Sequence, residues 1–140
     1  MISSPNNLAL SSKVVFVSSQ DARYPPLNAI DGNPKTFWTT TGMFPQEMII
    51  QLAEPAEPQR LVVYAAKLKK LEVHAASIEQ MEGIGNDGTD VFESITTIDL
   101  PEQNSTASIP LRLSRPVSHI KLVFAEGHSD FVAVRSIALE

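Results

Sequence analysis

Residues 27–47 read LNAIDGNPKTFWTTTGMFPQE, and this stretch is the most specific text in the 140-residue sequence. Asp31 and Gly32 begin a tight turn in which glycine can adopt a positive φ, and Pro34 stiffens the loop that follows. A loop buckled in this way turns backbone carbonyls inward, toward the Asp31 carboxylate and the Thr36 hydroxyl. Such oxygens are the ligands that calcium prefers. The same side chains could instead only cap the turn through hydrogen bonds to the backbone, and local spacing leaves both interpretations open.

The second half of this stretch contains Trp38, the only tryptophan of the chain, and the apolar run Met43, Phe44 and Pro45. A buried role with a satisfied indole N–H is favoured for Trp38 over stacking on a ligand. Exposed Met43 and Phe44 would form an adaptable apolar anchor for a protein partner. The alternative is that this loop folds back and closes one end of the fold.

Composition limits the class of protein. The net charge of −5 gives no basic field for a nucleic acid or an anionic membrane, and 140 residues predict one domain over residues 1–140. The absence of cysteine excludes disulfides and thiolate zinc sites and suits a reducing compartment. We find no secretory signal pattern at residues 1–10, and no apolar run long enough for a membrane span, so we expect a soluble intracellular protein.

Short β-type segments separated by proline, glycine and asparagine predict an all-β sandwich or barrel. The expected strands span residues 13–18, 47–52, 60–66, 70–75, 91–100, 107–114, 119–124 and 131–139. Pro110 belongs on an edge strand or at a bulge, and a shift of apolar parity predicts a bulge near Arg135 and Ser136. Residues 68–81 also fit a helical spacing, but their β-branched flanks favour a strand. Residues 83–90 are expected to form a surface loop.

Catalytic motifs are not convincing. Gly83, Gly85 and Gly88 have the spacing of a dinucleotide-binding loop, yet the segment that follows alternates like a strand instead of beginning a helix. The segment from Asp31 also fails as an EF-hand, since Gly42 occupies the position of the bidentate glutamate. The three histidines lack metal-ligand spacing. We therefore expect a protein that is not an enzyme.

The central stretch resembles a known signature. Residues 28–33, with Thr36 and Trp38, resemble the A-x-D-G-x-x-x-T-x-W pattern of discoidin or coagulation-factor type C domains, in the galactose-binding-like superfamily. Residues 31–47 also resemble the intraflagellar transport protein 25 family, which is classed as small-heat-shock-protein-B11-like. This resemblance implies an antiparallel jelly-roll β-sandwich of eight or nine strands, with structural Ca²⁺ in the loop after the first strand. The implied ligands are the carbonyls of Asn28 and Asn33, the Asp31 carboxylate, the Thr36 oxygens and a terminal carboxylate at Glu140.

The resemblance also implies a function. The family is a non-catalytic subunit of the ciliary intraflagellar transport train, complex B, found in the cytoplasm and in the cilium or flagellum. It forms a stable heterodimer with a Rab-like small GTPase, intraflagellar transport protein 27, among other complex B subunits. The superfamily signature supports a second hypothesis, a carbohydrate-binding module of the discoidin type. A small chaperone is a weaker alternative, because no oligomerising tail is visible.

Overall fold

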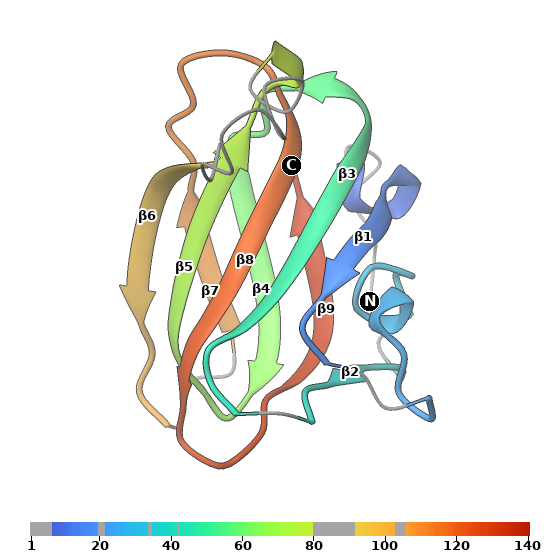
Figure 1. The fold of residues 1–140 in the computed structure, drawn as a ribbon, viewed down its shortest axis with the longest axis vertical. Coiled ribbons are helices and arrows are strands. Elements are labelled where there is room, and N and C mark those ends of the chain that lie inside the picture. The colour runs from blue at the N-terminus through green and yellow to red at the C-terminus, as the bar shows by residue number, and fades with distance from the viewer. Residues whose placement is uncertain (1–6, 20–21, 34, 42, 80–91, 103–105) are drawn as a thin grey trace, which may run out of the picture.

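The computed structural model describes residues 7–19, 22–33, 35–41, 43–79, 92–102 and 106–140. Nine strands and two short 3₁₀ helices are present in this part of the chain: η1 Leu8–Ser11, β1 Lys13–Val17, η2 Pro26–Ala29, β2 Trp38–Thr39, β3 Gln46–Ala56, β4 Arg60–Ala66, β5 Leu68–Ala76, β6 Glu93–Asp99, β7 Thr106–Pro110, β8 Val117–Gly127 and β9 Ala133–Leu139. The strands form two facing antiparallel sheets (Figure 1). The predicted antiparallel β-sandwich is therefore confirmed.

One sheet has the strand order β1-β3-β8-β5-β6, and the other has the order β2-β9-β4-β7. Alternation of apolar and polar residues decides which face of each strand is buried. In β3, Met48, Ile50 and Leu52 point into the sandwich while the residues between them are only half-buried. Burying the inner faces of both sheets produces one continuous core. Within the described residues, no helix is long and apolar enough to span a membrane.

Several expected strands are confirmed, with changes at their ends. Within residues 68–81, Leu68–Ala76 form a strand as favoured, whereas Ile78 and Glu79 are helical and residues 80–81 lie outside the described part of the chain. The expected strand at residues 107–114 is too long, because β7 ends at Pro110. Pro110 pairs with Arg60, the first residue of β4, so within the described residues β4 does not continue beside residues 111–114. Residues 83–90 lie outside the described part of the chain.

Two local irregularities follow the sequence predictions. Pro110 lies on β7, which is an edge strand of its sheet. In β9, Ser136 pairs with Tyr64 while Val134 pairs with Ala65, which leaves Arg135 as an extra residue in the strand. This is the predicted β-bulge, and it explains why the buried positions change parity along β9.

Candidate metal site and partner-binding loop

The loop that contains Asp31 is fixed to the core at its start. It follows η2, where Pro26 occupies an early position that tolerates the missing N–H. Ala29 and Ile30 are buried, and the Ile30 N–H donates to the carbonyl of Leu27 at 3.0 Å. The chain then turns through Gly32, whose φ is +74°. The prediction that this glycine provides a positive φ is thus confirmed.

Three acceptor oxygen atoms of this loop lie close to the hydroxyl of Thr36. Its Oγ1 lies 2.7 Å from Asp31 Oδ2, 3.1 Å from the Asn33 carbonyl oxygen and 3.4 Å from the Asn28 carbonyl oxygen. A hydroxyl has one hydrogen and can donate it fully to only one of these acceptors. The cluster is therefore rich in acceptors relative to its donors.

The Asp31 carboxylate also caps the turn. Its Oδ1 accepts the Asn33 N–H at 2.8 Å, while Oδ2 faces the Thr36 hydroxyl. The Asn33 side chain repeats the pattern by accepting the Lys35 N–H at 2.9 Å. The Asn33 carbonyl oxygen belongs to the oxygen cluster and also accepts the Thr36 backbone N–H at 3.2 Å. Turn capping and the oxygen cluster therefore share atoms, and both interpretations of the loop stay open.

The donor set of the loop fits a hard cation better than a transition metal. Asn28, Asp31, Asn33 and Thr36 contribute oxygen atoms only, which are the ligands typical of calcium. Among the described residues, no group of three or more His, Cys, Asp or Glu side chains could hold a metal ion. A cation at this loop would depend on carbonyl and hydroxyl oxygens, and Asp31 is the only acidic side chain of the loop itself.

Glu140 is the last residue of the chain and follows β9 directly. Its backbone N–H donates to the Arg60 carbonyl at 2.9 Å, and its own carbonyl accepts from Gln59 and Arg60, so it continues the pairing of β9 with β4. The preceding Leu139 N–H donates to Asn7 Oδ1 at 3.0 Å, next to η1. The end of β9 is thus tied to η1.

Trp38 is buried directly after this loop. Its side chain is fully inaccessible, its Nε1–H donates to the Ser19 carbonyl at 3.2 Å, and its ring meets Phe124 edge-on at 5.4 Å. The preceding residue, Phe37, stacks on Tyr24 with ring centroids 4.6 Å apart. These aromatic contacts hold the C-terminal side of the oxygen cluster against the core.

The apolar run after β2 could serve as an exposed anchor for a partner or as a cover for one end of the sandwich, and its residues divide between these roles. Met43 is 87% exposed, and Pro45 is also exposed. Phe44 instead turns back over Gly127, where a β-carbon built on the glycine would lie 2.6 Å from Phe44 Cζ. Thr41, Met43, Phe44, Ser129 and Asp130 line an open hollow of about 430 Å³. Phe44 thus covers this end of the sandwich while Met43 projects from it.

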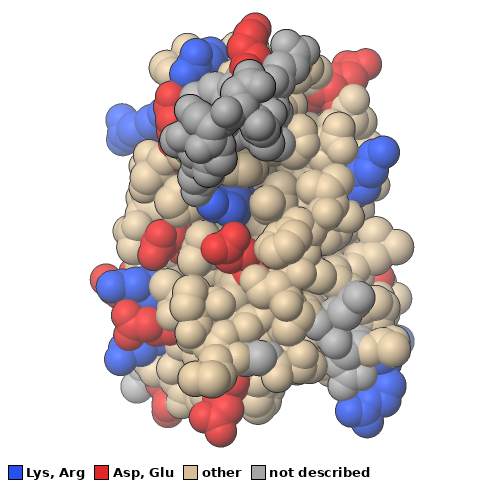
Figure 2. All heavy atoms as spheres, viewed as in Figure 1, with Lys and Arg blue, Asp and Glu red and all other residues tan. Residues whose placement is uncertain are grey.

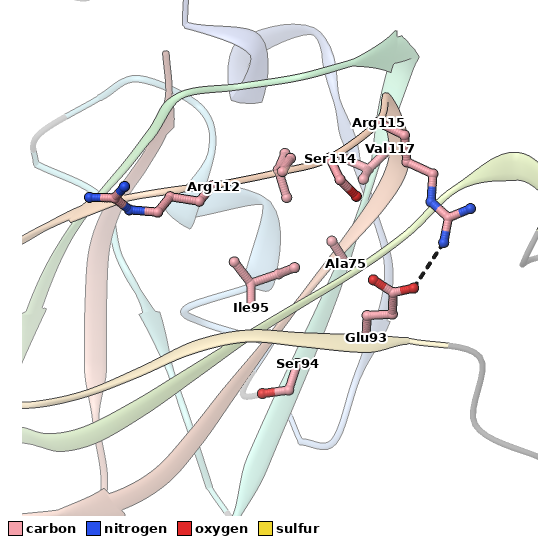
Figure 3. Close-up of a pocket in the computed structure, with 9 residues that line it drawn as sticks. Ala75, Glu93, Ser94, Ile95, Arg112, Ser114, Arg115 and Val117 are labelled. Atoms are coloured by element: carbon pink, nitrogen blue, oxygen red, sulfur yellow. Dashed lines mark hydrogen bonds and ion pairs between the residues drawn. The ribbon is translucent and has the colours of Figure 1, made fainter.

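Away from the predicted site residues, the described surface carries mixed charges and a further hollow. Figure 2 shows acidic and basic side chains interspersed on the face of the five-stranded sheet. A hollow of about 190 Å³ lies between β6 and residues 111–117, and there Arg115 pairs with Glu93 at 2.8 Å (Figure 3). Both charged side chains are about half exposed, as is usual for a surface ion pair. None of the predicted site residues lines this hollow.

Comparison with known proteins supports the fold and the resemblance that the sequence predicted. No protein-family model matches the sequence. The chain is 28% identical over 127 residues to intraflagellar transport protein 25 of Chlamydomonas reinhardtii, and 44% identical over 69 residues to the Homo sapiens homologue of that protein. Its curated homologues are named intraflagellar transport protein 25. The resemblance predicted from residues 31–47 is therefore confirmed.

These alignments cover only part of the relatives. The algal match spans 90% of this chain and 63% of the algal protein, whereas the human match spans 49% of this chain and 48% of the human protein. The chain thus spans between about half and two thirds of the length of the curated relatives it matches.

Solved structures resemble this chain in fold alone. A chitosan-binding module from Paenibacillus sp. IK-5 has a TM-score of 0.78 at 16% identity, covering 96% of this chain and 98% of that module. The family 32 carbohydrate-binding module of Clostridium perfringens NanJ, solved with galactose, has a TM-score of 0.73 at 18% identity, covering 94% and 95%. The fold is therefore a jelly-roll β-sandwich like that of these carbohydrate-binding modules.

Sequence reasoning found the loop but missed two of its supports. The contact between Leu10 of η1 and Gly32 joins residues far apart in the chain, with 2.8 Å between Leu10 Cδ2 and a β-carbon built on the glycine. The packing of Phe44 on Gly127 is also a long-range contact. A glycine in the sequence is only a weak sign of such a close contact, because glycine also occurs in exposed turns where no other residue packs against it.

Proposed function

We propose that this chain is a non-catalytic structural subunit of the intraflagellar transport train, within complex B, that works in the cytoplasm and the cilium or flagellum. The observation that carries this proposal is the similarity to intraflagellar transport protein 25 of Chlamydomonas reinhardtii, which extends over 90% of this chain. The residues that the sequence singled out are oxygen ligands, a buried tryptophan and an exposed apolar loop. Their chemistry suits stability and docking rather than turnover.

The proposed partner is a Rab-like small GTPase, intraflagellar transport protein 27, held in a stable heterodimer. Met43 supports this docking role because a flexible thioether side chain that is 87% exposed can adapt to a partner surface. Phe44 gives Met43 a fixed base, since its ring is packed against Gly127. Exposed Pro45 restricts the backbone of the same loop.

The test is co-purification of this chain with the GTPase, followed by size-exclusion chromatography with light scattering at about 1 μM, which would retain a stable pair. We expect one peak with the mass of a heterodimer. Met43→Asp should weaken the pair by at least about tenfold, because it places a charge at an apolar contact. Ile78→Asp is the matched control, since Ile78 is an exposed apolar residue outside this loop. Two separate peaks for the wild-type proteins would contradict the proposal.

The loop is proposed to bind Ca²⁺ as a structural ion. Its ligands would be the carbonyls of Asn28 and Asn33, the Asp31 carboxylate and the Thr36 oxygens. Support comes from the three acceptor oxygens around the Thr36 hydroxyl, which share one hydroxyl hydrogen, with a further hydrogen bond from the Thr36 N–H to the Asn33 carbonyl alone. Bound calcium would neutralise this cluster and join the turn to the segment that leads to Trp38.

Glu140 is proposed as a further ligand from the end of the chain. A carboxylate there would supply a second negative charge to balance a divalent ion. The variant Glu140→Gln keeps the side-chain shape and removes the charge. If Glu140 is a ligand, this variant should bind Ca²⁺ more weakly than the wild type.

Thermal unfolding with Ca²⁺ and with a chelator tests the ion. At one hundred times the dissociation constant, Ca²⁺ should stabilise the wild type by about 2.7 kcal/mol. Asp31→Asn should lose most of this response, while Asp130→Asn, an exposed acidic residue in another loop, should keep it. Identical melting curves for the wild type in Ca²⁺ and in chelator would reject calcium binding, and turn capping would then be the role of these oxygens.

A carbohydrate-binding module is the second candidate function. It is favoured by the likeness in fold to modules solved with sugars, such as the NanJ module with galactose. A glycan array would show saturable binding to a defined sugar if this candidate is correct. A blank array together with a stable GTPase complex would reject it.

A further inference from the structure

Exposed apolar side chains are concentrated at one margin of the five-stranded sheet. Leu10, Val15, Phe16 and Leu27 are each between 44% and 59% exposed, and they account for half of the large exposed apolar side chains among the described residues. They belong to η1, β1 and η2, which lie together at this margin (Figure 1). Clustered apolar exposure of this kind marks an interaction surface more often than scattered apolar residues do.

The margin is an open sheet edge. β1 is the first strand of its sheet, and among the strands that the structure describes it pairs with β3 alone. Among the described residues, the backbone of Lys13–Val17 makes no recorded hydrogen bond on its other side. An edge of this kind presents N–H and C=O groups that can pair with another strand.

A β-bulge gives this edge its apolar character. Val14 pairs with Ile50 and Phe16 with Ile49, so Val15 is an extra residue without a partner in β3. Regular alternation would bury one of any two successive side chains. Because of the bulge, both Val15 and Phe16 are exposed, at 46% and 48%.

The edge forms one side of a groove. Residues 13–17 line it together with Pro25, Pro26 and Leu27, and its open volume is about 450 Å³. Lys13 is the only charged residue among the described residues that line it. Figure 2 agrees, since the surface over β1 is mostly neither acidic nor basic.

We propose that this groove, hereafter the β1 groove, is a docking site for an extended strand of a protein partner, with alternating apolar side chains and an acidic residue near Lys13. The backbone of the strand would pair with the open edge of β1, and its apolar side chains would cover Val15, Phe16 and Leu27. The surface shares no residue with the Met43 loop, so this interaction is additional to the GTPase pairing proposed above.

A single strand fits the β1 groove better than a second copy of this chain does. Pro25, Pro26 and Leu27 form a wall of the groove beside β1, and a second folded copy would have to fit its whole sheet past this wall to bring its own β1 alongside. A lone extended segment can enter beside that wall. The single positive charge of the lining also selects for an acidic partner segment.

The probe for this test is a synthetic nonapeptide that alternates valine and threonine and has a glutamate at each end. It is titrated into the ¹⁵N-labelled chain, and backbone amide shifts are followed by NMR. We expect saturable shifts at residues 13–17 with a dissociation constant below about 1 mM. The same peptide N-methylated at alternate residues should bind at least about tenfold more weakly, because it cannot donate to the sheet edge.

Variants separate the groove from general apolar binding. Val15→Thr combined with Phe16→Thr should weaken peptide binding at least about tenfold, whereas Tyr64→Thr, at an exposed position of the other sheet, should change it by less than about twofold. Lys13→Glu should reverse the preference, so that a peptide with a lysine at each end binds better than the original. This variant changes only an exposed side chain, so it keeps the test informative if the double variant is unstable.

Three results would overturn the proposal. The first is saturable shifts that map away from the β1 groove, or no shifts at all. The second is equal binding of the N-methylated peptide. The third is a dimer of this chain, measured by light scattering, that the Val15→Thr and Phe16→Thr pair abolishes, since the occupant would then be a second copy.

Discussion

The substitution Gly32→Ala tests how the oxygen-rich loop is held, because it changes the turn and adds one carbon atom. Gly32 has a φ of +74°, a conformation that costs an L residue about 1–2 kcal/mol. The new β-carbon would also lie 2.8 Å from Leu10 Cδ2. Leu10 is 44% exposed and its terminal methyl group can rotate away, which costs about 0.5–1.5 kcal/mol if the rotamer is displaced.

An opposing effect reduces the net cost. Alanine restricts the unfolded chain more than glycine does, which favours folding by about 0.4–1 kcal/mol. The expected loss in the free energy of unfolding is therefore about 1–2 kcal/mol, or roughly 3–8 °C in melting temperature for a chain of this size. Chemical denaturation in the presence of a chelator measures this loss without any contribution from bound calcium.

A double-mutant cycle with Leu10→Ala divides the loss into its two parts. In that background the contact with the leucine methyl group is absent, so Gly32→Ala should cost less than in the wild type, about 0.5–1 kcal/mol after the effect on the unfolded chain is subtracted. Lys35→Ala is the control, because Lys35 is exposed and its side chain should contribute within about 0.5 kcal/mol. A neutral or stabilising Gly32→Ala would refute this account of the turn.

Three further predictions concern the core, the far end of the sandwich and pH. Trp38→Ala should reduce the free energy of unfolding by about 3–5 kcal/mol in urea titrations, with Trp38→Phe costing less, and an equal cost for both would contradict packing as the cause. Gly127→Ala should displace the Phe44 ring and change its NMR shifts, because the β-carbon would lie 2.6 Å from Cζ and 3.1 Å from the carbonyl oxygen of Lys67, and unchanged shifts would exclude this contact. Burial lowers the pKa of His119 below its ordinary value of 6.5, so the unfolded chain binds the proton more readily and stability should fall as the pH decreases through this range. His119→Gln should reduce that fall in denaturation curves at about pH 7.5 and 5.5, and an unchanged pH dependence would contradict the assignment.

Local patterns in the sequence predicted elements well but predicted their limits poorly. Alternation placed β3 and β8 correctly in the interior of each strand, yet both strands are longer than residues 47–52 and 119–124 suggested. The reverse error occurred at β7, where alternation continues past Pro110 although the neighbouring strand does not. Strand ends depend on whether a partner strand is present, and a single segment contains no information about its partner.

In the candidate site, too, local sequence predicted the features that depend on nearby residues but not those that depend on strand pairing. Asp31, Gly32 and Thr36 were identified because turn chemistry acts over a few residues, where the sequence specifies geometry directly. The position of Glu140 depends instead on the pairing of β9 with β4, which the local sequence does not contain. Its role as a ligand thus stays a prediction.

The order of residues alone determined an all-β protein with a tight turn at Asp31 and Gly32, since the alternation of side chains and the steric freedom of glycine operate over short distances. Only the tertiary structure decided that Phe44 covers Gly127, that Leu10 touches Gly32, and that Val15 and Phe16 are both exposed beside an open sheet edge. These features arise when segments distant in the chain meet and compete for the same space. Which side chains remain available for a partner is therefore a property of the packed sandwich.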